Sequence, residues 1–195
     1  MRQATITRDT NETKITLTIN LDGKGRCDAS SGVGFFNHML ELFARHGRFD
    51  LSLECVGDLA VDGHHTVEDI GISLGEAFKQ ALGEKRGITR FADLHQPMDE
   101  ALVFVALDIS GRGFLDCRLD LSSHKAGEMD TQLVEEFLHG LVRIMGLTLH
   151  IRQLAGKNDH HIIEAVFKGL GRALAQAVSV NPALEGEIPS TKGVL

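Results

Sequence analysis

Several features that define whole classes of protein are missing from this sequence. Tryptophan and tyrosine do not occur, and the three cysteines, Cys27, Cys55 and Cys117, are far apart and form no CxxC pair. An odd number of widely spaced cysteines argues against a disulfide framework and against a zinc knuckle. We therefore expect reduced thiols.

Long apolar runs and an excess of positive charge are also missing. The segment from Met1 to Thr10 is polar, so we expect no secretory signal, no transmembrane span and a cytoplasmic location. The formal net charge is −7. Nonspecific binding to a nucleic acid requires clustered lysine and arginine, so this balance argues against it. The negative net charge is still compatible with a local basic pocket that binds one phosphate.

Histidine, by contrast, is abundant, with ten residues in a chain of 195. The hydrophobic content of 43% is enough for a real core, so the chain is expected to fold. An excess of histidine in a folded chain indicates that some of these side chains have a chemical role.

The sequence contains an internal repeat. Residues 64–68, HHTVE, return as residues 160–164, HHIIE, and residues 74–78 align with residues 170–174 at the same spacing. Two matched segments in one register indicate two related halves. We place them at residues 1–86 and 87–195, the second including the C-terminal tail.

Both halves show the same order of predicted elements, β-β-α-β-α. Each half would leave an apolar helix face uncovered, and packing the helices of the two halves together would bury both faces. We therefore expect one compact α/β protein with a helical layer between two sheets. Four of the six strands have predicted bounds, 17–25, 49–56, 105–113 and 147–154, and the predicted helices are 35–45, 64–82, 131–145 and 160–178. Residues 82–90 are expected to join the halves, and the tail after Pro182 is expected to be loop-like.

The two histidine doublets stand where helices are expected to begin. Asp62-Gly63 precedes the first doublet and Asn158-Asp159 the second, and such residues cap helix starts. Glu68 follows His64 by one helical turn, near both imidazoles. Adjacent side chains on a helix diverge by about 100°, so the two imidazoles of a doublet are expected to serve two different metal ions.

Metal binding explains the duplicated pattern better than chance does. A single HHxxE motif is as often a set of hydrogen-bonded histidines, but two copies in register favour metal ligation. Nitrogen and oxygen donors without thiolate suit Mn²⁺, Fe²⁺, Ni²⁺ or Zn²⁺, and the carboxylates favour the harder end of that series. The residues leave the identity of the metal open.

Four longer motifs resemble the imidazoleglycerol-phosphate dehydratase family: FFNHML at 35–40, DGHHTVED at 62–69, LHIR at 149–152 and DHHIIEA at 159–165. The likeness runs from about Arg8 to Lys192. It implies a fold like domain 2 of ribosomal protein S5, with two four-stranded mixed sheets around the helices. It also implies a hydro-lyase of histidine biosynthesis that removes water from D-erythro-imidazole-glycerol phosphate through a metal-bound imidazolate, giving imidazole-acetol phosphate.

The resemblance further implies two Mn²⁺ ions per active site. Many relatives have VEHF where this chain has Val134-Glu135-Glu136-Phe137, so Glu136 is expected to ligate as a carboxylate. His139 is a nearby alternative, but it is out of the family register. The implied ligands are His38, His64, His65, Glu68, Glu136, His160, His161 and Glu164.

The remaining roles also follow from the resemblance. Glu12 matches the family's acid/base residue, although by sequence alone it is typical of a solvated loop acid. The other residues expected in the catalytic set are His46, Glu68 and Glu164. Asp99 is a further candidate. Arginine and lysine side chains suit phosphate oxygens. The candidates are far apart in the sequence, so only folding or assembly could bring them together. The expected substrate-binding residues are Glu12, Arg90, Arg112, Lys168, Ser190 and Lys192.

The resemblance implies a homo-oligomer as well, a 24-subunit shell built from trimers with active sites at subunit contacts. Two other classes of protein fit parts of the pattern. A noncatalytic RNA-binding module shares the β-β-α-β-α unit, but the net charge and the repeated ligand sets count against it. A di-metal hydrolase also needs paired ions and a carboxylate base.

Overall fold

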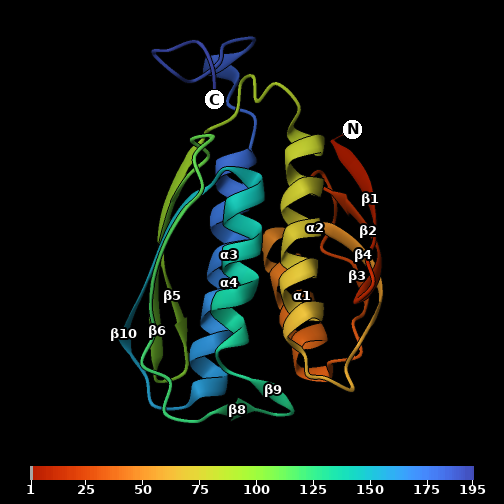
Figure 1. Ribbon diagram of the computed structural model, residues 1–195. Coiled ribbons are helices and arrows are strands. Elements are labelled where there is room, and N and C mark those ends of the chain that lie inside the picture. Colours follow the sequence, from red (N-terminus) through yellow and green to blue (C-terminus); the bar gives the residue numbers. More distant parts are fainter. Residues whose placement is uncertain (1) are drawn as a thin grey trace.

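The computed structural model describes residues 2–195. In that part of the chain, the four α-helices form a layer between two four-stranded sheets (Figure 1). None of these helices is long and apolar enough to cross a membrane. The arrangement of the helices between two sheets confirms the predicted sandwich.

The first half forms one mixed sheet and two helices. Strand β2 pairs antiparallel with β1 and β4, whereas β3 runs parallel to β4, giving the order β1-β2-β4-β3. Alternate residues of β2, Ile15, Leu17 and Ile19, point into the core, as period-two patterning requires. The elements are β1 Gln3–Asp9, β2 Thr13–Asn20, β3 Cys27–Ser30, α1 Gly34–Gly47, β4 Asp50–Gly57 and α2 His64–Leu82.

The second half repeats this plan in the order β5-β6-β10-β7, and β10 pairs parallel with β7. It adds a two-stranded hairpin, β8 and β9, before its first helix. The elements are β5 Phe91–Met98, β6 Ala101–Asp108, β7 Phe114–Arg118, β8 Lys125–Ala126, β9 Met129–Asp130, α3 Leu133–Met145, β10 Thr148–Ala155, α4 Asp159–Val178 and the short 3₁₀-helix η1 Pro182–Leu184.

The helices of one half pack against those of the other, α1 on α4 and α2 on α3. Glycines at equivalent places bring the backbones together. A Cβ on Gly75 would lie 2.7 Å from the carbonyl oxygen of Leu141, and one on Gly171 would lie 2.4 Å from that of Phe43. Any larger side chain would push the paired helices apart, so the two halves share one interior.

The structure also differs from the predicted β-β-α-β-α unit. Each half has an additional strand before its first helix, β3 or β7, and the latter half has the β8–β9 hairpin as well. Strand β3 has only four residues, and β8 and β9 have two each, so their alternation is too short to stand out in the sequence. The predicted bounds of α2, 64–82, match the observed bounds.

Candidate active site

The two histidine doublets lie at the first turns of α2 and α4, as their flanking residues predict. The Asn158 side chain accepts a hydrogen bond from the His160 amide at 3.0 Å and caps α4. At α2 the acceptor is Asp62, 2.7 Å from the His64 amide. Helix α2 begins at His64, directly after its N-cap Gly63, and α4 begins at Asp159, one residue before its doublet.

Within each doublet the two imidazoles diverge. The rings of His64 and His65 are inclined by 88°, and those of His160 and His161 by 81°, with centroids about 6 Å apart in each pair. Each doublet therefore presents one imidazole to its helix neighbours and turns the other toward a different set of partners.

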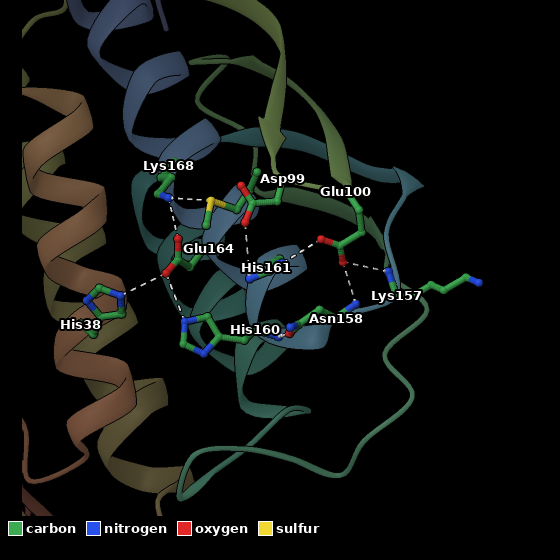
Figure 2. A network of polar contacts seen from close by, with 10 residues as sticks. His38, Asp99, Glu100, Lys157, Asn158, His160, His161, Glu164 and Lys168 are labelled. Atoms are coloured by element: carbon green, nitrogen blue, oxygen red, sulfur yellow. Dashed lines mark hydrogen bonds and ion pairs between the residues drawn. The ribbon is translucent and has the colours of Figure 1, made fainter.

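One cluster of donor atoms joins the two halves of the chain (Figure 2). Glu164 Oε1 lies 3.1 Å from His160 Nε2 and 3.1 Å from His38 Nε2. His38 stands on α1 of the first half, whereas the other two residues stand on α4 of the second. One donor atom from each residue lies within 4.8 Å of the others, so this cluster could hold a metal ion.

The Glu164 carboxylate is held in its charged form. Burial raises its pKa, but hydrogen bonds from Lys168, His38 and His160 and the charge of Lys168 outweigh that effect and bring the pKa to about 2. Lys168 Nζ lies 2.5 Å from Oε2, the oxygen that does not face the histidines. The other oxygen, Oε1, therefore remains available to the imidazoles of His38 and His160.

A related arrangement stands on α2. His64 Nε2 lies 3.9 Å from Glu68 Oε2, and Glu68 also faces Arg143 of α3 at 3.6 Å. Glu68 was expected near both imidazoles, but His65 turns away toward Asp58. The structure therefore places one histidine, His64, beside this carboxylate, and the expectation of two is wrong.

The helix pairing also locates Glu136. The backbone contact between Gly75 and Leu141 corresponds to that between Gly171 and Phe43, and Glu136 precedes Leu141 by the same number of positions as His38 precedes Phe43. Glu136 therefore occupies, relative to α2, the place that His38 occupies relative to α4. His139 is exposed and does not share this register.

The second imidazole of each doublet is fixed by a carboxylate that the sequence did not single out. His65 Nδ1 lies 2.9 Å from Asp58 Oδ2, and His161 Nδ1 lies 2.7 Å from Glu100 Oε2. These bonds raise the pKa of both histidines, and the bond from His161 is the main reason why the pKa of Glu100 falls to about 2. Each bond engages Nδ1, so Nε2 is the ring nitrogen left for a further partner.

An acid at a hairpin tip faces each of these Nε2 atoms. Glu12 Oε1, from the β1–β2 turn, lies 3.7 Å from His65 Nε2, and Asp99 Oδ2, from the β5–β6 turn, lies 3.8 Å from His161 Nε2. Glu12 and Asp99 are thus matched by the pseudo-symmetry of the chain (Figure 2 shows Asp99). Sequence spacing alone gives no signal for Glu100, since its partner lies in a distant helix.

His46 and Lys168 lie on the adjoining helices α1 and α4. Desolvation, Lys168 and Arg172 all lower the pKa of His46, so this imidazole is neutral near pH 7. His46 lies in a hollow with Arg172 and Ala175, further along α4 than Lys168.

The other predicted phosphate-binding residues gather at the opposite end of the helices. The Arg90 guanidinium binds Asp108 at 2.7 Å and the Pro189 carbonyl at 2.6 Å, and the Arg90 amide donates to the carbonyl of Ala177 near the end of α4. Glu164 is near the start of that helix, roughly 20 Å away along its axis. Gly111, beside Arg112, packs on Leu195, so the tail that carries Ser190 and Lys192 lies at this end too (Figure 1).

Fold and site together define a duplicated α/β enzyme in which histidine and carboxylate sets from two halves meet. Residues 31–174 match the family model described as imidazoleglycerol-phosphate dehydratase. Proteins of that name from Azorhizobium caulinodans and Xanthobacter autotrophicus are 60% and 57% identical over 195 residues, covering 100% of this chain and 99% of each relative.

Solved structures agree with these matches. The imidazoleglycerol-phosphate dehydratase of Staphylococcus aureus superimposes with a TM-score of 0.83 at 38% identity, covering 92% of this chain and 99% of that one. The enzyme from Pyrococcus furiosus gives a TM-score of 0.85 at 38% identity, with 97% and 100% covered. The chain belongs to the imidazoleglycerol-phosphate dehydratase family and is a dehydratase, a hydro-lyase.

Proposed function

We propose that this dehydratase removes water from D-erythro-imidazole-glycerol phosphate, giving imidazole-acetol phosphate in histidine biosynthesis, and that it works in the cytoplasm with two divalent ions per site. The observation that carries the proposal is the meeting of His38, His160 and Glu164 from two halves of the chain. Their nitrogen and oxygen donors suit Mn²⁺, with Fe²⁺, Ni²⁺ and Zn²⁺ as alternatives.

The residues present fit such ions. Donor atoms of one cluster lie within 4.8 Å of one another, and its carboxylate is ionised. Bound ions would act as Lewis acids on the imidazole ring of the substrate and so make loss of the hydroxyl easier. The residues that would hold them are His38, His64, His65, Glu68, Glu136, His160, His161 and Glu164.

Glu12 is the residue that we propose moves the proton. Its carboxylate is exposed at a hairpin tip and faces His65 at 3.7 Å, so a substrate held beside that imidazole would come within its reach. As a base, Glu12 would take the proton from the substrate carbon, and as an acid it would return a proton when the enol becomes the ketone. His46, neutral and near Lys168, would hydrogen bond to the polar end of the substrate.

The phosphate would be bound by cations from a different subunit. Lys168 stands beside the metal-ligand cluster, but Arg90, Arg112, Ser190 and Lys192 lie at the far end of the same chain. A small substrate cannot span roughly 20 Å. We therefore propose active sites at subunit contacts of a homo-oligomer, a 24-mer built from trimers.

The second imidazole of each doublet, that of His65 or His161, supports the same assembly. His65 and His161 are each held at Nδ1 and each turn Nε2 away from the donor clusters on their own helices. One imidazole alone is a poor metal site. A neighbouring subunit that brings its own cluster against His65 or His161 would complete the set of ligands.

The proposal is tested by assaying imidazole-acetol phosphate formation after chelation and after return of Mn²⁺, with metal content measured on the same samples. Chelation should abolish turnover and Mn²⁺ should restore it. Full activity with no bound metal would overturn the metal-dependent part. A Glu12→Gln variant keeps size and loses the basic oxygen, so kcat should fall by roughly 10²–10⁴ while the substrate still binds.

A further inference from the structure

A buried polar network joins the hairpin that carries Glu12 to the helix that carries His65. Asp69, one residue after Glu68, is 6% exposed on α2. The Thr13 hydroxyl donates to Asp69 Oδ2 at 2.5 Å, and an Arg8 guanidinium nitrogen lies 2.9 Å from Asp69 Oδ1. Arg8 and Thr13 flank the β1–β2 turn, so one carboxylate holds both sides of it.

The turn itself is ordered by short-range hydrogen bonds. The Thr10 hydroxyl accepts from the amides of Glu12 at 3.2 Å and Thr13 at 2.9 Å. The carbonyl of Glu12 accepts from the amide of Asp58 at 3.0 Å, and Asp58 is the residue that fixes His65. Glu12 is therefore tied to the His65 side of α2 on one face and, through Thr13, to Asp69 on the other.

The second half of the chain shows that the fold does not require this network. The position equivalent to Asp69 is Ala165, which is fully buried in α4. There the β5–β6 turn is held instead by Glu100, which accepts from the amides of Asn158 at 2.9 Å and Lys157 at 3.3 Å (Figure 2). Both hairpin tips are thus tethered to a helix start, by unrelated residues.

Stability alone does not account for an ion pair in this place. Desolvation of two charges often cancels their attraction, and a pair of apolar residues commonly serves as well. Here the Arg8 Nε is buried without a hydrogen-bond partner, which adds a cost. What the ion pair and the Thr13 hydroxyl supply is a defined position for the turn.

We propose that Asp69 is a positioning residue which, through Thr13 and Arg8, fixes the β1–β2 turn so that Glu12 faces His65. The inference rests on the proposed role of Glu12 in proton transfer. A small displacement of a catalytic group costs much of its effect, since the group must already stand in the reactive geometry.

The sharpest variant is Thr13→Val, which keeps the shape of the side chain and removes the donor. We expect kcat to fall roughly 10- to 100-fold, with KM within about twofold because Thr13 itself makes no proposed contact with the substrate and the other substrate-binding residues are unchanged. Metal content and subunit assembly should stay as in the parent enzyme. Asp69→Asn should act in the same direction, and Thr13→Ser, which retains the hydroxyl, should restore the rate.

A matched control is Thr18→Val on the same strand. Thr18 pairs with Thr5 on the outer face of the sheet, at 2.8 Å, and its loss should leave kcat unchanged. Hydrogen exchange supplies a readout independent of activity: the peptide spanning residues 9–14 should exchange faster in Thr13→Val, whereas peptides from α2 should not.

Combining variants shows whether Thr13 acts through Glu12. In a Glu12→Gln background, Thr13→Val should cause no further loss of kcat, because the group that it positions is already disabled. An undiminished loss in that background, or a parent-like kcat for both Thr13→Val and Asp69→Asn, would overturn the inference. A fully active Glu12→Gln enzyme would instead remove the proposed role of Glu12, and the positioning role with it.

Discussion

Glu100 Oε2 lies 2.7 Å from His161 Nδ1, and Asp58 Oδ2 lies 2.9 Å from the corresponding atom of His65. Both carboxylates precede their helix in the sequence, one from a hairpin and one from a loop. Each engages Nδ1 and orients the ring, so Nε2 is the nitrogen available to a metal ion.

Removal of Glu100 should therefore weaken metal binding without removing a ligand. In Glu100→Ala, His161 loses its orientation, and we expect the affinity for Mn²⁺ to fall about 10- to 100-fold, as for other carboxylates that support a ligating histidine. Competition with a metal-binding dye would measure it. Glu76→Ala, at an exposed position on α2, is the control and should bind as the parent does.

The helix register predicts different outcomes for two neighbours on α3. Glu136→Ala should lower the number of ions bound per chain, because Glu136 occupies the same position relative to α2 that His38 occupies relative to α4. His139→Ala, at an exposed position, should bind the parent number. Elemental analysis after gel filtration compares them, and a loss confined to His139→Ala would exchange their roles.

Assembly should depend on the metal. Ions that bridge subunits bind only the assembled form and stabilise it by linkage. We expect stripped protein to sediment as a small species, a trimer, and to form a large shell when Mn²⁺ returns. His161→Ala should shift this transition to higher Mn²⁺ concentration. A metal-replete monomer with full activity would show that each chain builds its own site.

The three thiols should be slow to react in the folded protein. Burial raises the pKa of Cys27 and Cys55 to about 11 and that of Cys117 to about 12. Free cysteine has a pKa of about 8.5, so only the unfolded chain ionises substantially near pH 9. Alkylation at pH 8 should be fast in denaturant and slow without it. Stability should also fall as pH rises above about 8.5, since the unfolded state then releases protons first.

The sequence revealed the repeat, the long helices and the histidine doublets because each leaves a local signal. HHxxE recurs in one register, Asn158 and Asp62 mark helix starts, and apolar residues follow the helical period. The divergence of adjacent imidazoles also followed from helix geometry alone. The family resemblance then supplied residues such as Glu12 that have no local signal.

Contacts between distant segments were not predictable in this way. No spacing shows that His38 meets the second doublet and not the first, since that depends on α1 packing against α4. The buried pairing of Asp69 with Arg8 and Thr13, and the distance between Arg90 and Glu164, likewise depend on how the halves are folded together. Such relationships are properties of the tertiary structure.

The exchange of helix partners between the halves bears on how such a chain could arise. His38 of the first half completes the cluster on α4 of the second half, and Glu136 of the second half occupies the equivalent position beside α2 of the first half. A free-standing half would carry only part of each cluster. Two identical halves related by a two-fold axis would complete both, so a symmetric dimer of half-length chains already contains both donor clusters.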